Sequence, residues 1–229
     1  RQFASTRLRG QVRQSPLRSA LVIGNPSTQG FDTAYLDSKG QPCALPPDLP
    51  GAEAEVEAVA GVLSNLGYQV KRLGGPDFLA ADVLSALYQQ PWRILHVSAH
   101  GVFNQRHVDG GWRSGVVLSD GLLVTAVEIG AMEIVPDLVF LNCCHLAKVD
   151  VDSGGNRLAA SVARELIDMG VRCVIVAGWA VNDAIARRFG EVFYRELLLE
   201  QQPFGLAVFS ARQAAWEAGQ GQDITWGAF

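Results

Sequence analysis

The sequence predicts an α/β domain in which a mostly parallel β-sheet is covered by helices on both faces. Two patterns support this prediction. Short apolar runs of strand length alternate with segments whose apolar residues recur at helical spacing, and most connections between them are short turns. The chain has 229 residues, of which 48% are hydrophobic and 18% are charged, so one such domain can bury a sizeable core.

Five segments are predicted as strands because they are short, apolar and bounded by turn residues. They are residues 20–24, 68–73, 93–99, 137–142 and 171–177. Helices are predicted where apolar residues recur three and four positions apart. These are residues 53–66, 79–89, 125–132, 156–169, 183–201 and 204–217.

The remaining segments have weaker patterns. Residues 25–50 are rich in Gly, Pro, Ser and Asp and are predicted to form a long loop. Residues 102–120 are also loop-rich, with room for a short strand at 115–118. Residues 1–18 carry five arginines and no acid, so we expect a basic tail or linker from a missing upstream region, followed by one domain over 19–229.

Composition excludes several classes of protein. The net charge of −4 argues against a nucleic-acid-binding surface spread over the domain. No apolar run reaches the ~18 residues that a membrane span needs, and no secretory signal is visible. Four cysteines do not make a disulfide framework in a chain of this length, so a cytoplasmic location is expected.

Neither a cofactor nor a metal is expected. The turn after the first strand, residues 24–27, lacks the repeated glycines and the lysine of a phosphate-binding loop. Adjacent cysteines are poor tetrahedral ligands, and no second Cys/His pair has zinc-site spacing.

Reactive residue types follow two of the predicted strands. His100 follows the third strand, and Cys143 and Cys144 follow the fourth. Active sites of open parallel sheets form at the carboxyl ends of strands, so a thiol and an imidazole can meet there as a nucleophile and its base. The N–H groups of Gly101 and of the attacking cysteine would then hold an oxyanion. The alternative is purely structural, with His100 in a loop and the cysteines packed as small apolar residues.

Three segments resemble the CHAT domain when taken in order. They are residues 94–101 (Ile-Leu-His-Val-Ser-Ala-His-Gly), 138–146 (Leu-Val-Phe-Leu-Asn-Cys-Cys-His-Leu) and 178–183 (Gly-Trp-Ala-Val-Asn-Asp). The resemblance extends over about residues 21–229. CHAT domains belong to the caspase-like cysteine peptidases, alongside separase, gingipain and legumain. The resemblance therefore implies a caspase-like three-layer α/β/α sandwich around a mostly parallel sheet.

The resemblance also implies roles for matching positions. His100 and Cys144 would form the catalytic dyad, Gly101 and Cys144 would supply the oxyanion N–H groups, and Cys143 would fill a small-residue position and pack. Two adjacent cysteines depart from the usual pattern, which leaves open which thiol attacks. Asp183 matches an acid that would favour Arg or Lys before the scissile bond, although Asn182 or Asp183 could simply cap the following helix.

The function implied is that of a regulated cysteine endopeptidase that cuts a dedicated protein partner, in bacterial defence or regulated cell death. Its regulatory domain or partner would lie outside this chain, and neither membrane nor nucleic acid is expected as a partner. Two alternatives remain: a catalytically silent interaction module, and a thioesterase or amidase that uses the same dyad.

A second histidine, His96, is expected to be a hydrogen-bonded core residue.

Overall fold

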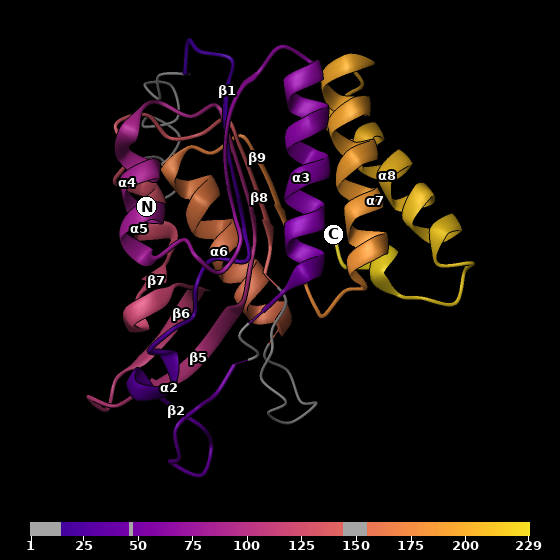
Figure 1. The fold of residues 1–229 in the computed structure, drawn as a ribbon. Coiled ribbons are helices and arrows are strands. Elements are labelled where there is room, and N and C mark those ends of the chain that lie inside the picture. The colour runs from indigo at the N-terminus through magenta and orange to yellow at the C-terminus, as the bar shows by residue number, and fades with distance from the viewer. Residues whose placement is uncertain (1–14, 46–47, 144–154) are drawn as a thin grey trace.

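A computed structural model describes residues 15–45, 48–143 and 155–229, with the side chains of the helix that starts at residue 155 described from residue 162. The central sheet has five parallel strands in the order β3-β1-β4-β8-β9 (Figure 1). They are β1 (Ser19–Gly24), β3 (Gln69–Gly74), β4 (Ile94–Ser98), β8 (Leu138–Asn142) and β9 (Cys173–Val176). The five predicted strands are thus confirmed, each to within two residues.

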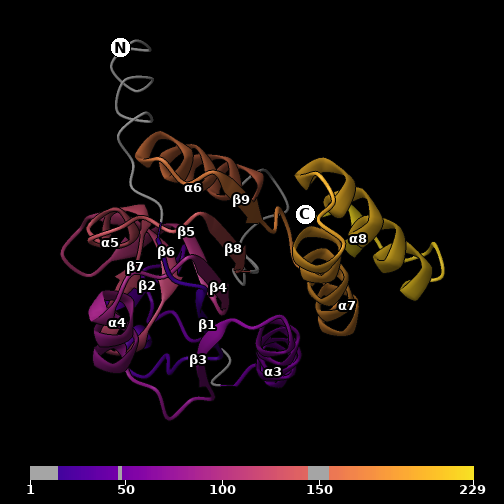
Figure 2. The ribbon, with the colours of Figure 1, turned by 90° about the horizontal axis from the view of Figure 1, so that it is seen from above.

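Helices cover both faces of this sheet (Figure 2). On one face lie α3 (Pro50–Asn65) and α7 (Asp183–Tyr194), with α8 (Phe204–Ala218) packed against α7. On the other lie α4 (Ala80–Gln89), α5 (Ala126–Gly130) and α6 (Gly155–Met169). The predicted three-layer α/β/α sandwich is confirmed.

Strand β1 shows why the sheet lies in the centre. All six of its residues are buried, as expected for a strand with a neighbour on each side and helices on both faces. Ala20 and Val22 pack into the core with α3 and α7, whereas Leu21 and Ile23 pack with α4 on the opposite face. The alternation of side chains along a strand therefore divides one apolar run between two cores.

A second, antiparallel sheet lies beyond the carboxyl ends of β4 and β8, with the order β2-β5-β6-β7. Its strands are β2 (Tyr35–Leu36), β5 (Gly101–His107), β6 (Trp112–Val117) and β7 (Leu123–Val124). The short strand suggested at 115–118 overlaps β6, but the rest of the predicted loop-rich segment 102–120 contains β5 and the start of β6. The predicted long loop over 25–50 contains β2 and the short helix α2 (Phe31–Ala34). Strand β5 escaped detection because it exposes polar residues on one side, and a bulge between Val102 and Gln105 breaks its alternation.

Predicted helix ends differ most at α7. The helix gives way at Arg195–Leu199 to a π-helical segment, η2, and the chain leaves it through Gln201, whose φ is +52°. The prediction of one helix over 183–201 was therefore too long. Within the described residues, no helix has both the length and the apolar character that a membrane crossing requires.

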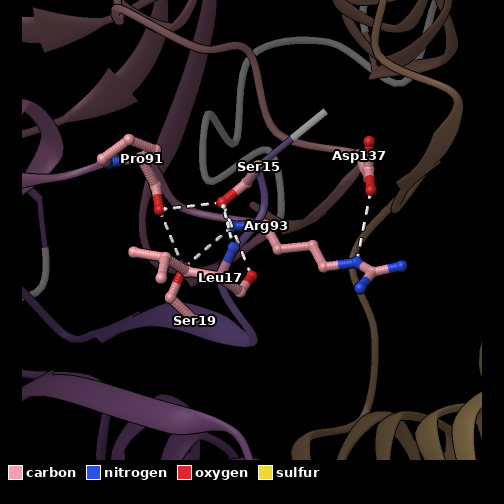
Figure 3. A network of polar contacts seen from close by, with 6 residues as sticks. All are labelled: Ser15, Leu17, Ser19, Pro91, Arg93 and Asp137. Carbon is pink, nitrogen blue, oxygen red and sulfur yellow. Dashed lines mark hydrogen bonds and ion pairs between the residues drawn. The ribbon is translucent and has the colours of Figure 1, made fainter. Parts of the chain in front are cut away.

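The amino ends of the central strands are joined by contacts to the backbone (Figure 3). The hydroxyls of Ser15 and Ser19 both donate to the carbonyl of Pro91, at 3.2 and 2.8 Å. The N–H of Arg93 donates to the Ser19 carbonyl at 3.0 Å, and its guanidinium lies 3.2 Å from the Asp137 carboxylate. Ser15 is buried, whereas residues 1–14 of the predicted basic tail lie outside the described residues.

Candidate active site

The candidate site begins where two neighbouring strands end together. β4 and β8 are parallel neighbours, and their register pairs the last residue of each, Ser98 with Asn142. The N–H of Ala99 then donates to the Asn142 carbonyl at 3.2 Å, so the pairing continues one residue further. The predicted meeting of these two strand ends at one edge of the sheet is confirmed.

His100 lies in the connection between the two sheets. It is only 2% exposed, and its carbonyl accepts a hydrogen bond of 2.8 Å from the N–H of Val117 in β6. The backbone at this position is therefore held from both sides, by β4 before it and by the antiparallel sheet after it.

Gly101 lies directly against Cys143. A Cβ atom at position 101 would lie 3.1 Å from the Cβ of Cys143 and 3.2 Å from its carbonyl oxygen, tighter than nine in ten real contacts of this kind. Glycine is therefore favoured here, because any larger residue would push Cys143 or its backbone aside. The segments after β4 and β8 are thus in contact.

Cys143 itself is a core residue. It is 7% exposed and packs among the apolar side chains beneath α4, α5 and α6, as expected for the small-residue position. Cys144, predicted as the nucleophile and as an oxyanion donor, and its neighbour His145 lie outside the described residues.

The other two described cysteines, Cys43 and Cys173, have thiols with raised pKa values. Burial, reinforced by the charge of Asp37, raises the pKa of Cys43. Burial, with the charge of Asp137, likewise raises the pKa of Cys173. Both thiols are therefore less ionised at neutral pH than an ordinary cysteine.

Asp183 is the first residue of α7, and Asn182 is the cap of that helix. The Asn182 side-chain oxygen accepts from the N–H groups of Ala184 and Ile185 at 3.1 and 3.3 Å. Of the two predicted capping residues, Asn182 therefore makes the capping hydrogen bonds, and the carboxylate of Asp183 points elsewhere.

The Asp183 carboxylate packs against the first turn of α3. It occupies the space beside Gly51 so closely that a Cβ atom at position 51 would overlap it. Burial of this carboxyl group, followed by the charge of Glu55, raises the pKa of Asp183, even though the residue as a whole is exposed. Gly51 covers the carboxyl end of the side chain, which explains the difference.

More acids stand at the same edge of the sheet, and sequence reasoning missed them. Asn25, which follows β1 and is buried, donates from Nδ2 to Asp48 at 2.6 Å and to Glu53 at 2.8 Å. Its Oδ1 accepts from the N–H of Leu49, at 3.0 Å, just before α3 begins. No described Lys or Arg forms an ion pair with Asp48, Glu53 or Asp183. Their proximity to the first turn of a predicted helix was the available signal.

The prediction for His96 is confirmed. Its ring is fully buried, lies 3.1 Å from Glu55 through Nε2 and 3.1 Å from the Tyr194 hydroxyl through Nδ1, and stacks on Phe140. It is a hydrogen-bonded core residue. Across the parts of the chain that the structure describes, no group of three His, Cys, Asp or Glu residues is arranged to hold a metal ion.

The five-stranded parallel sheet, its helical layers and the paired ends of β4 and β8 define the fold of the caspase-like cysteine peptidases. The CHAT domain family matches residues 1–229, and the chain therefore belongs to that family.

Solved structures agree with this fold at low sequence identity. The Arg-specific cysteine proteinase gingipain R (RgpB) aligns with 88% of this chain at 15% identity and a TM-score of 0.51. The complex of the Porphyromonas gingivalis RgpB pro- and mature domains aligns with 93% of it at 14% identity and a TM-score of 0.55. The chain spans only 42% and 47% of those two chains. No curated protein sequence matches it.

Proposed function

We propose that this chain is a cysteine endopeptidase in which His100 and Cys144 form the catalytic dyad. The observation that carries the proposal is the close approach of Gly101 to Cys143 at the paired ends of β4 and β8. Counting two residues beyond the paired Ser98 and Asn142 gives His100 and Cys144. Neighbouring strands are about 4.8 Å apart, so side chains that follow two adjacent strand ends are near enough to come within hydrogen-bond reach of each other.

The reaction follows from these roles. His100 takes the proton of the Cys144 thiol, and the thiolate sulfur attacks the scissile carbonyl carbon. The N–H groups of Gly101 and Cys144 hold the resulting oxyanion. The C–N bond then breaks as His100 returns the proton to the leaving amine, and water attacks the thioester with His100 as base, which regenerates the thiol.

We also propose that the peptidase prefers Arg or Lys before the scissile bond, with Asp183 as the carboxylate that receives the side chain. Glu53 lies in the first turn of α3, and Asp48 and Asp183 lie beside that turn; none of the three has a described Lys or Arg partner. Uncompensated negative charge at the edge of the candidate site favours a cationic substrate group. The physiological substrate would be a dedicated protein partner, with regulation supplied from outside this chain.

The test is cleavage of a peptide library that varies the residue before the scissile bond. The variants are Cys144→Ala, Cys143→Ala and Asp183→Ala. We expect cleavage after Arg or Lys that is lost in C144A, persists in C143A and loses its basic preference in D183A. Loss in C143A with activity retained in C144A would overturn the choice of nucleophile.

Other outcomes separate the remaining functions. Cleavage of a thioester or a simple amide without cleavage of any peptide would indicate an acyl hydrolase instead. Absence of selective labelling of Cys144 by a peptidyl electrophile would indicate a silent interaction module.

A further inference from the structure

Glu55 is a buried carboxylate beneath the candidate site. It belongs to the second turn of α3 and is 1% exposed. Its Oε2 accepts from the Ser98 hydroxyl at 2.9 Å and from Asn142 Nδ2 at 2.6 Å. Its Oε1 lies 3.1 Å from His96 Nε2. One side chain thus connects a helix with two neighbouring strands.

Such a residue is costly in a core. Removing a carboxylate from water is strongly unfavourable unless hydrogen bonds compensate, and an apolar side chain of similar size often stabilises as much or more. Among the described residues, Glu55 has hydrogen-bond donors around it but no Lys or Arg partner. Stability alone therefore does not account for a carboxylate here.

The two residues that donate to Oε2 are the last residues of their strands. Ser98 ends β4, two positions before His100, and Asn142 ends β8, two positions before Cys144. A single oxygen atom that accepts from both side chains bridges the two strand ends, in addition to the backbone pairing between them. The proposed base and the proposed nucleophile each follow one of these two strand ends in sequence.

The network continues into α7. His96 Nδ1 lies 3.1 Å from the Tyr194 hydroxyl, and burial together with the charge of Glu55 raises the pKa of Tyr194 well above its ordinary value. Tyr194 is therefore a neutral phenol. Because a neutral imidazole has two tautomers, His96 can either donate to or accept from a group at position 55 while the phenol adapts at its other nitrogen.

We propose that Glu55 is a positioning residue for the dyad. It holds the ends of β4 and β8 through Ser98 and Asn142, and thereby sets the spacing of His100 and Cys144. The inference rests on the proposed peptidase function and deepens it. It concerns geometry, so the hydrogen-bond acceptor at Oε2 is the required feature and the negative charge is not.

Variants of Glu55 can separate its hydrogen-bond acceptor at Oε2 from its negative charge. Glu55→Gln keeps an oxygen that can accept from Ser98 and Asn142, while its NH2 group faces His96, which can accept in its other tautomer. Glu55→Met has similar volume and no comparable acceptor. The control is Glu57→Met on the same helix, where Glu57 is exposed and pairs only with Arg72 among the described residues.

For each variant, a thermal melt first checks that the protein is folded, and two further measurements are then made. One is kcat and KM on the best library peptide, and the other is the rate of Cys144 alkylation by iodoacetamide as a function of pH. We expect kcat of E55M to fall about 10- to 100-fold with KM little changed, because misplacement of reacting groups by about 1 Å has effects of this size. Its Cys144 pKa from alkylation should rise. E55Q should stay within about threefold of wild type, and E57M should match it.

Ser98→Ala tests the same contact from β4, because it removes the donor to Glu55, with little risk to folding. It removes one of the two donors to Oε2, so we expect a smaller loss of kcat than in E55M. In the E55M background the same change should have no further effect, because the contact is already gone. Full additivity of the two losses would overturn the inference.

The remaining outcomes distinguish this inference from the function on which it rests. If wild type cleaves peptides and E55M does so equally well, the positioning role fails and the peptidase function stands. If E55Q loses as much activity as E55M, charge rather than geometry matters and the inference is overturned. If wild-type Cys144 alkylates as an ordinary thiol, the dyad fails and the inference fails with it. If peptides are not cleaved but Cys144 has a lowered pKa, the peptidase function fails, and the alkylation profiles of E55M and E55Q still decide the positioning role.

Discussion

The two ends of the central sheet are stabilised in different ways. At the amino ends, Ser15 and Ser19 donate to one backbone carbonyl, and a partly exposed ion pair joins Arg93 to Asp137. At the carboxyl ends, a buried carboxylate, tight glycine contacts and several acids gather around the strand termini. The first arrangement satisfies the backbone at low cost. The second places charge where it is expensive, which is typical of a site that is built for chemistry.

The largest effect is expected from Gly101→Ala at the carboxyl end. The new methyl group would meet the Cβ and carbonyl of Cys143 at little over 3 Å, so one of the two strand ends must move. Because Gly101 is also the proposed oxyanion donor, we expect kcat/KM to fall about 100-fold. Peptide cleavage by the purified variant checks this. Activity within threefold of wild type would show that the close approach is not needed for turnover.

Gly51→Ala should have a smaller and more selective effect. The added Cβ would displace the Asp183 carboxylate, so the preference for Arg or Lys should fall about tenfold, while cleavage after apolar residues stays unchanged. Gly61→Ala is the matched control, because it lies on the same helix with open space around it. That control should stabilise the helix by up to about 1 kcal/mol without changing specificity. Equal behaviour of the two variants would exclude Asp183 from substrate recognition.

A pH dependence of a few-fold should accompany the raised pKa of Asp183. Only the ionised carboxylate attracts a cationic side chain, so KM for an Arg peptide should rise on acidification at a higher pH than an ordinary aspartate would allow. Folding raises the pKa of Asp183 above its value in the unfolded chain. The free energy of unfolding therefore falls as pH rises from the unfolded-state pKa through the folded-state pKa. Asp183→Asn should remove the contribution of this carboxyl group to both dependences. Kinetic and melting profiles from pH 4 to 8 measure them.

The smallest effects are expected at the amino ends. Ser19→Ala removes a buried hydrogen bond to Pro91 and should cost about 1 kcal/mol of unfolding free energy. Arg93→Ala removes a partly exposed ion pair and should cost about 0.5 kcal/mol or less. Neither should change kcat once the protein is folded. Urea denaturation and peptide cleavage together test this, and a large kinetic effect would show that the two ends of the sheet are coupled.

The sequence predicted the strands of the parallel sheet and missed β5 of the antiparallel sheet. Strand β1 is a continuous apolar run because helices cover both of its faces. Strand β5 exposes the polar residues Asn104 and Arg106 and carries a bulge that breaks its alternation, so no apolar run marks it. The strand ends that carry His100 and Cys143 were predictable for a related reason, since parallel strands end at one edge of a sheet.

Glu55 was not predicted because its partners come from β4 and β8, more than 40 residues away in sequence. A charged side chain in an amphipathic helix is ordinarily assigned to the solvated face. The available signal was its position four residues before Val59, on the apolar side of α3. Only the folded structure shows that Ser98 and Asn142 donate hydrogen bonds to this carboxylate.

The unequal chemistry of the thiols has a practical consequence. Cys143 is shielded by the core, and Cys43 and Cys173 have raised pKa values, so all three should react slowly with soft electrophiles at neutral pH. Labelling of these three cysteines should therefore add little background when functional protein is titrated with an irreversible thiol probe. One equivalent of rapid incorporation per chain would count competent molecules directly, and would allow screening for activating partners without knowledge of the natural substrate.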